Sequence, residues 1–226
     1  VSERSTARLN SLGAARLYAI LDLGYVEPAE ALNAADQLIR GGVDLIQLRA
    51  KKQSADRVHE LAAQLHRLTN AAGVPLIIND HPEIARDLPV EGLHLGQDDL
   101  ALAAARELVG RKDCWFGKST HSVAQAVAAA AEGADYIGFG PLFATPTKPA
   151  YVPIGIDDIR QAYELVQLPI FCIGGIKLNN LPQVLAAGAK RVVIVSGLLQ
   201  NADIAAATRA AKQFLEKQQS EIRNQQ

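Results

Sequence analysis

One loop of this sequence gathers side chains that would suit a polyanion. The stretch Gly133–Pro149, GADYIGFGPLFATPTKP, runs from a strand-like segment into a proline-rich loop. Thr145, Thr147 and Lys148 place two hydroxyls and an ammonium within four residues, and the neighbouring prolines disfavour a helix there. Charge-assisted hydrogen bonds from such a cluster suit a phosphate ester or a diphosphate. The alternative is a solvated turn rich in threonine and proline.

A second group of cations ends the strand-like segment VDLIQLR. Side chains alternate along a strand, so Gln47 and Arg49 share one face while apolar neighbours occupy the other. If the apolar face packs against helices, Gln47 and Arg49 point the opposite way, and Lys51 continues the series. These groups would bind an anion, or they would form an internal ion pair. Burying the cations without a partner would be costly, so we expect an acidic group nearby.

Three acids follow the next two strand-like segments. Asp80 comes after Asn79 in PLIIND, and Asp98 and Asp99 come after GLHLGQ. Each acid could instead cap a helix that starts nearby. Capping needs one acid per helix, however, and three are present. Carboxylates beside a diphosphate would hold Mg²⁺, which takes one or two protein carboxylates together with substrate phosphates and water. We expect Asp80 and Asp99, ahead of Asp98, to be the metal ligands.

Polar residues also follow the segment CWFGKS. Ser119 offers a hydroxyl at its end, and His121 follows two residues later. His121 could be a general acid or base, or it could be a surface or supporting histidine. Ser122 and Gln125 have the spacing of a capping box, which predicts a structural role for that pair.

The elements that must position these groups alternate regularly along the chain. Eight strand-like runs are expected at 17–22, 43–49, 75–80, 92–96, 114–119, 136–140, 169–175 and 191–197. Helical runs are expected at about 27–40, 54–71, 82–87, 100–109, 122–132, 156–166, 178–187 and 202–216. Apolar strands that alternate with helices predict a parallel sheet covered by helices.

Eight such pairs predict an α/β protein with a (β/α)8 TIM barrel, and the alternative is a doubly wound open sheet. We expect one domain over 1–226: a short N-terminal helix at 3–14, a barrel core at about 15–217 and a polar, frayed tail at 218–226. Chemistry gathers at the carboxyl ends of barrel strands. Gly175 and Ser196, after strands seven and eight, would then form a phosphate site, or serve as ordinary turn residues.

Composition limits the partners and the compartment. The 226 residues carry a formal net charge of −1, so no global field attracts nucleic acid or an anionic membrane. No signal peptide or apolar membrane span is expected. Cys114 and Cys172 fall in strand-like runs without metal-ligand spacing, which indicates reduced core thiols in a cytoplasmic protein.

The motifs together resemble one known family. IQLRAKK, IIND, GLHLGQDD, GKSTH, GADYIGFGPLFATPTKP, IGGI and VVIVSG occur in the order and spacing of the thiamine-phosphate synthase family, over nearly the whole chain. IGGI is common to many barrels, whereas HLGQDD combined with the TPTK loop is specific. The resemblance implies that 4-amino-5-hydroxymethyl-2-methylpyrimidine diphosphate condenses with 4-methyl-5-(2-phosphoethyl)thiazole. The products would be thiamine phosphate and pyrophosphate.

The resemblance also implies a role for each motif residue. The residues implied around the pyrimidine diphosphate are Gln47, Arg49, Lys51, Asn79, Ser119 and Lys148, with Arg49, Ser119 and Lys148 as the catalytic ones. Asp80 and Asp99 would hold the Mg²⁺ cofactor, and the thiazole phosphate would meet Thr145, Thr147, Gly175, Val195 and Ser196. Family enzymes are thought to ionise the C–O bond first. The protein would then stabilise the departing pyrophosphate, align the thiazole nitrogen and exclude water.

Two other functions compete with this one. A sister thiazole tautomerase of the same fold would use a histidine at the position of His121 as its acid or base. A non-catalytic barrel that binds a phosphate ligand would lack the metal and leaving-group residues. The intact QDD and TPTK motifs favour the synthase. Its partners would be small-molecule substrates, and pairing through outer helices would make it a homodimer.

Overall fold

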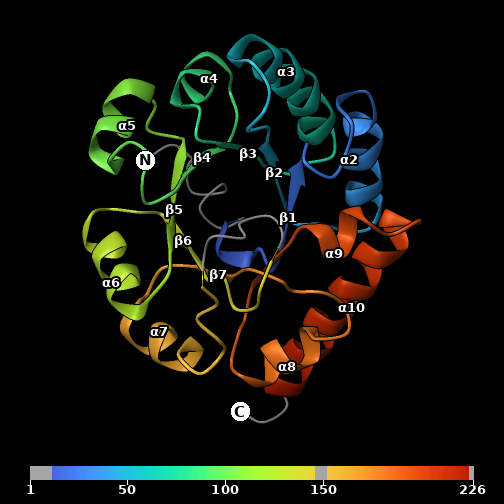
Figure 1. Cartoon of the computed structure of the whole chain (residues 1–226), viewed down its shortest axis with the longest axis vertical. Coiled ribbons are helices and arrows are strands. Elements are labelled where there is room, and N and C mark those ends of the chain that lie inside the picture. The colour runs from blue at the N-terminus through green and yellow to red at the C-terminus, as the bar shows by residue number, and fades with distance from the viewer. Residues whose placement is uncertain (1–11, 146–151, 224–226) are drawn as a thin grey trace.

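The strands of the protein form a closed barrel (Figure 1). The computed structural model describes residues 12–145 and 152–223. Eight parallel strands pair in chain order, and the last pairs with the first. They are β1 (Leu17–Asp22), β2 (Leu45–Arg49), β3 (Leu76–Asn79), β4 (Gly92–Leu95), β5 (Trp115–Thr120), β6 (Tyr136–Phe139), β7 (Ile170–Cys172) and β8 (Val192–Ile194). The predicted (β/α)8 barrel is confirmed, and the open-sheet alternative is wrong.

Helices cover the outside of the ring, as Figure 1 shows. Each connection between consecutive strands contains at least one helix, and two more helices follow β8. The helices are η1 (Pro28–Glu30), α2 (Ala31–Arg40), α3 (Ala55–Ala71), α4 (Pro82–Asp87), α5 (Leu102–Val109), α6 (Val123–Ala131), α7 (Ile159–Leu165), α8 (Leu181–Ala186), α9 (Ser196–Leu199) and α10 (Ile204–Arg223). Most begin and end within three residues of the expected positions.

Alternation along the strands separates two apolar clusters. On β2, Ile46 and Leu48 pack in the cluster between sheet and helices, whereas Leu45 packs inside the barrel. Rings fill much of the interior, including those of Tyr18, Trp115, Tyr136 and Phe171. Because side chains point alternately in and out, Gln47 and Arg49 face inward with Leu45. The predicted orientation of the β2 side chains is therefore confirmed.

The N-terminal segment closes the interior cluster. Residues 12–14 are helical, which agrees with the end of the helix expected at 3–14, while 3–11 lie outside the described residues. The blue helical turn near the centre of the ring in Figure 1 is this segment. Leu12 is buried and packs with the apolar residues inside the barrel. The segment therefore contributes to the barrel core.

Two strands end earlier than the sequence pattern indicates. β7 ends at Cys172 because Gly174 and Gly175 follow with φ of 102° and 66°, and such left-handed values break a strand. β8 ends at Ile194, and the short helix α9 begins at Ser196. This helix was not predicted, since SGLL is too short to display helical periodicity.

The last helix is longer than the sequence pattern indicates. Helix α10 continues to Arg223, seven residues beyond the predicted end of the last helix at residue 216. The side-chain amide of Gln218 donates to the carbonyl oxygens of Leu185 (3.0 Å) and Ala189 (3.1 Å). These bonds tie the polar end of α10 to the end of α8, which composition alone could not reveal.

No helix within 12–145 and 152–223 is long and apolar enough to cross a membrane.

Candidate active site

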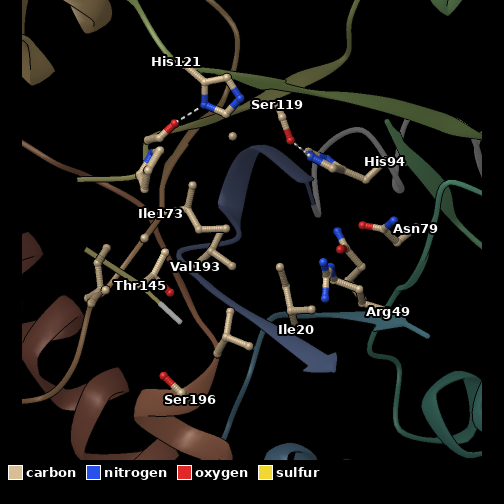
Figure 2. Close-up of a pocket in the computed structure, with 18 residues that line it drawn as sticks. Ile20, Arg49, Asn79, His94, Ser119, His121, Thr145, Ile173, Val193 and Ser196 are labelled. Carbon is tan, nitrogen blue, oxygen red and sulfur yellow. Dashed lines mark hydrogen bonds between the residues drawn. The ribbon is translucent and has the colours of Figure 1, made fainter. Parts of the chain in front are cut away.

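A pocket opens at the carboxyl ends of the strands. Figure 2 shows its apolar centre, formed by Ile20, Ile173 and Val193, with polar side chains around it. In this view Thr145 and Ser196 lie across the pocket from Asn79 and His94. Among the predicted site residues, the lining includes Gln47, Arg49, Asn79, Ser119, Thr145, Gly175, Val195 and Ser196. The structure therefore brings most of the predicted substrate-binding residues together.

Arg49 has the acidic neighbour that its burial requires, and that neighbour is Asp22. Nη1 of Arg49 lies 2.6 Å from Oδ2 of Asp22, and only 3% of the Asp22 side chain is exposed. The two residues are aligned in the register of β1 and β2. Asp22 also accepts a hydrogen bond from the backbone N–H of Gly24, at 2.9 Å. Arg49 thus takes part in an ion pair, as one interpretation expected, and it also lines the pocket, where anion binding stays a prediction.

Asp80 and Asp99 lie close enough for their side chains to share a hydrogen bond. Burial raises the pKa of Asp80, and the Asp99 carboxyl raises it further, while Lys51 opposes the shift. Burial also acts to raise the pKa of Asp99, but hydrogen bonds from Asp80 and the Gly96 backbone outweigh it, and the net shift is downward. Lys51 forms an ion pair with Asp80. Two carboxyls this close together offer a cation two hard oxygen ligands.

The backbone around these acids is held in place by its own hydrogen bonds. Asp80 has a φ of 63°, the only left-handed value of a non-glycine residue in the described part of the chain, and its N–H donates to the His94 carbonyl at 3.0 Å. Asp99 Oδ2 accepts from the Gly96 N–H at 2.6 Å. Lys118, buried and outside the predicted set, donates to the Gly96 carbonyl at 2.7 Å. Gly96 therefore links Asp99 to β5.

The capping alternative for the acids is wrong. Helix α4 has His81 at its N-cap and α5 has Ala101, and neither helix has a side-chain capping bond. By contrast, the predicted cap of α6 is confirmed, because Ser122 Oγ accepts from the Gln125 N–H at 3.1 Å. Asp98, the third acid, has no capping role at α5. The acids at these strand ends therefore do not serve as helix caps.

The opposite wall of the pocket depends on two glycines. A side chain at Gly174 would come within 2.4 Å of Pro141, and one at Gly175 within 2.7 Å of Phe143. Only glycine therefore allows the loop after β7 to pack against the loop after β6. Leu142 and Phe143 donate to the carbonyls of Ile173 (2.8 Å) and Gly174 (3.0 Å), so the two loops are joined by backbone hydrogen bonds.

Two further pocket residues were missed or left open by sequence reasoning. His94 lies between Ser119 and Tyr136, with Nε2 3.0 Å from Ser119 Oγ and Nδ1 3.2 Å from the Tyr136 hydroxyl. Alternation in GLHLG could have placed His94 on the inner face. His121 lines the pocket, where its Nδ1 contacts the Gly140 carbonyl, as the dashed line in Figure 2 marks.

The remaining sequence expectations concern the loop after β6, the two cysteines and a metal site. Thr147 and Lys148 lie outside the described residues, so their positions stay predictions. Cys114 and Cys172 are buried free thiols, as expected, and burial raises the pKa of each to about 12. Within 12–145 and 152–223, no group of three or more His, Cys, Asp or Glu side chains could hold a metal ion. A metal site here would therefore rest on two carboxylates.

Comparisons with known proteins decide the family. The model of the thiamine monophosphate synthase family matches residues 17–198. The chain belongs to the thiamine monophosphate synthase family. A thiamine-phosphate synthase of Chloroflexus aurantiacus is 41% identical over 195 residues, covering 86% of this chain and 89% of that protein. One from Halalkalibacterium halodurans is 44% identical over 191 residues, covering 84% and 90%.

A solved structure agrees with this membership. The thiamine phosphate pyrophosphorylase of Pyrococcus furiosus superimposes with a TM-score of 0.82 at 27% identity, over 93% of this chain and 98% of that one. A 3-hexulose-6-phosphate synthase at 17% identity and a TM-score of 0.64 shares the barrel fold. Membership in the thiamine monophosphate synthase family makes the chain a transferase that forms thiamine phosphate. The tautomerase and the non-catalytic barrel are not favoured.

Proposed function

We propose that the pocket condenses the aminopyrimidine diphosphate with the thiazole phosphate, and that Mg²⁺ bound by Asp80 and Asp99 assists the departure of pyrophosphate. The observation that carries this proposal is the meeting of opposite charges at one rim. Two carboxyls share a hydrogen bond there, while Lys51 and Arg49 present cations close by. A diphosphate with a divalent ion would satisfy both charges.

The residues fit a magnesium ion by chemistry and number. Mg²⁺ prefers oxygen ligands and commonly takes one or two carboxylates, keeping water and substrate phosphate for its other positions. Burial and the neighbouring Asp99 carboxyl both raise the pKa of Asp80, and a divalent cation held by the two acids would offset their mutual repulsion. When bound, Mg²⁺ would neutralise charge that develops on the leaving pyrophosphate.

Arg49 would bind the diphosphate from the wall at β2. Its guanidinium presents several donors in a fixed plane, and the bond to Asp22 holds that plane at the rim. Lys51 would exchange its contact with Asp80 for a phosphate oxygen once the metal is bound. Lys148 would add a third cation from the loop beyond β6. Together these groups would stabilise the charge of the leaving group.

Gln47, Asn79 and Ser119 would orient the pyrimidine ring above the apolar centre of the pocket. Ile20, Ile173 and Val193 would exclude water from a reactive pyrimidinylmethyl cation. The thiazole phosphate would lie toward Thr145, Thr147, Gly175, Val195 and Ser196. Fixing the two rings in line would supply much of the rate enhancement, since no side chain needs to act as a nucleophile.

A coupled assay tests the proposal. Both substrates are incubated with Mg²⁺, and the release of pyrophosphate and the formation of thiamine phosphate are followed. Asp99→Ala and Lys148→Ala are expected to lower turnover by orders of magnitude while leaving the barrel folded by circular dichroism. Asp87→Asn is the matched control, because Asp87 ends α4 as an exposed acid paired with Arg86. Near-normal rates for both site variants would overturn the proposal.

We also propose a cytoplasmic location and a homodimer. Two buried free thiols support a reducing compartment. Exposed apolar side chains on outer helices, Leu108 on α5 and Val127 on α6, support pairing through that surface. Sedimentation of the wild type and of the double variant Leu108→Lys, Val127→Lys tests the dimer. A monomeric wild type would refute it.

A further inference from the structure

Five side chains form a continuous hydrogen-bonded chain beneath the pocket. Gln47 Nε2 donates to the Tyr18 hydroxyl at 2.6 Å, and that hydroxyl lies 3.3 Å from the hydroxyl of Tyr136. Tyr136 lies 3.2 Å from Nδ1 of His94, whose Nε2 lies 3.0 Å from Ser119 Oγ. Both ends of the chain, Gln47 and Ser119, line the pocket. We call these five residues the polar chain.

The middle of the polar chain is fully inside the barrel. Tyr18 is 1% exposed and Tyr136 is 0% exposed, and their rings pack edge to face with that of Phe171. Burial raises the pKa of both phenols, so each keeps its proton at neutral pH. A neutral phenol donates one hydrogen bond only. Because a buried hydroxyl proton left unpaired is costly, the donor of one hydrogen bond in the polar chain favours the donor of the next.

The direction of the chain follows from its first link. The Gln47 amide donates to Tyr18, and the buried Tyr18 proton then has a partner among the described residues only if it donates to Tyr136. The proton of Tyr136 then goes to Nδ1 of His94, which must be the unprotonated ring nitrogen. The protonated Nε2 donates to Ser119 Oγ, and the serine proton remains for a ligand.

The two ends consequently present opposite polarities to the pocket. Gln47 Oε1 is buried and has no hydrogen-bond partner within residues 12–145 and 152–223, so this wall offers an acceptor. Ser119 offers a donor from the wall at β5. An aminopyrimidine carries the complementary pair, because its exocyclic amine donates and its ring nitrogens accept. A 4-oxopyrimidine with a ring N–H carries the reverse pair.

We propose that Tyr136 is a positioning residue that, through Tyr18 and His94, fixes Gln47 as an acceptor and Ser119 as a donor, and so selects an aminopyrimidine over an oxopyrimidine. The proposal rests on the proposed function, since it assigns the ring specificity of that site. Exchanging the acceptor at Gln47 and the donor at Ser119 would require every hydrogen bond of the polar chain to reverse together. A hydrogen-bonded network of this kind is more cooperative than separate pairs.

Gly117 provides independent support for the positioning role of Tyr136. The two residues are aligned in the register of β5 and β6, and a side chain at Gly117 would lie 2.1 Å from the Tyr136 ring. His94 is aligned with Gly117 on the other side. The absence of a side chain at residue 117 therefore lets Tyr136 reach across β5 to His94.

Tyr136→Phe tests the proposal, with Tyr163→Phe as the matched control. Tyr163 on α7 also has a hydroxyl in two hydrogen bonds, to the Ile170 carbonyl (2.7 Å) and from the Lys190 N–H (3.1 Å), but it lies outside the pocket lining. The assay compares kcat/KM for the 4-amino and 4-oxo pyrimidine diphosphates at saturating thiazole phosphate. Tyr136→Phe is expected to reduce the preference for the amino substrate about tenfold, roughly the effect of one hydrogen bond. Tyr163→Phe should leave this preference unchanged.

A second measurement uses the wild type and so does not depend on a variant that folds. The ¹⁵N NMR signals of His94, assigned by their loss in His94→Gln, distinguish the two neutral tautomers. The Nε2–H tautomer is expected, and the Nδ1–H tautomer would overturn the proposal. An unchanged substrate preference in folded Tyr136→Phe would also overturn it. A wild type that forms no thiamine phosphate from the two substrates would instead refute the proposed function.

Discussion

The Arg49 guanidinium lies 2.6 Å from the Asp22 carboxylate, on the adjacent strand and in register with it. Both side chains point to the rim of the pocket, and both are nearly buried. The pair gives the anion site a permanent counter-charge when no substrate is bound. Arg49 is therefore positioned before a diphosphate arrives.

Asp22→Asn is expected to lower the free energy of unfolding by about 3 kcal/mol, because it leaves a buried cation without its partner. Pyrophosphate should restore much of this loss by supplying the missing negative charge. Urea unfolding with and without pyrophosphate measures both effects. Asp135→Asn is the control, since it breaks the Arg106–Asp135 pair (2.8 Å) away from the pocket. An equal effect of pyrophosphate on both variants would contradict the expectation.

Asp99→Asn is expected to weaken Mg²⁺ activation and to lower turnover by at least about a hundredfold, as expected for loss of a directly coordinating group. Asp80→Asn should act in the same direction, because both carboxyls belong to the same pair. Initial rates over a range of Mg²⁺ concentrations provide the measurement. If either variant kept the wild-type dependence on Mg²⁺, that residue would not be a ligand.

Lys118→Met tests how the Asp99 loop is held. Lys118 donates to the Gly96 carbonyl, and the Gly96 N–H donates to Asp99, so loss of the ammonium should loosen the carboxylate. We expect a several-fold higher Mg²⁺ concentration for half-maximal activity, in the range typical of residues that support metal ligands. Lys112→Met, a change of the same kind at an exposed residue before β5, should have no such effect. Equal behaviour of the two variants would remove Lys118 from this role.

Gly117→Ala is expected to destabilise the barrel by about 1–3 kcal/mol, because the new methyl group would meet the Tyr136 ring. The loss of stability should appear as a lower midpoint in thermal unfolding. Gly13→Ala is the control, since a side chain there would meet nothing within 4 Å. A wild-type midpoint for Gly117→Ala would show that the ring can move aside.

Stability is expected to fall as the pH rises above about 9. Burial raises the pKa of the Cys114 and Cys172 thiols from 9.0 to about 12, so both ionise more easily in the unfolded chain. Their stabilising contribution is complete below pH 9 and is lost between pH 9 and 12. Each thiol adds a slope of about 1.4 kcal/mol per pH unit in that window. Urea unfolding at several pH values should show a shallower decline in Cys114→Ala, Cys172→Ala. An identical decline would argue against ionisation of the thiols as its cause.

The sequence pattern was sufficient to predict the barrel fold and the side chains that β2 points into it. Strand alternation alone oriented Gln47 and Arg49, because its period is independent of tertiary structure. It could not supply Asp22 as the partner of Arg49, since that pairing depends on strand register. Alternation could have included His94, but the residue stands alone among apolar neighbours in GLHLG.

Other features depend on contacts that a linear pattern does not contain. Lys118 points away from the barrel interior and still reaches the site, through the Gly96 carbonyl. The polar end of α10 is ordered by Gln218, whose acceptors belong to α8 and the turn after it. In each case a distant backbone carbonyl determines the role of the side chain.

The left-handed backbone of Asp80 has a consequence for how this protein can change. A non-glycine residue with φ of 63° costs free energy, and glycine at that position would relieve the cost. Selection for heat resistance alone would therefore favour removal of a carboxylate that the reaction is proposed to need. At residue 80, stability of the barrel favours glycine, whereas the proposed metal site requires aspartate.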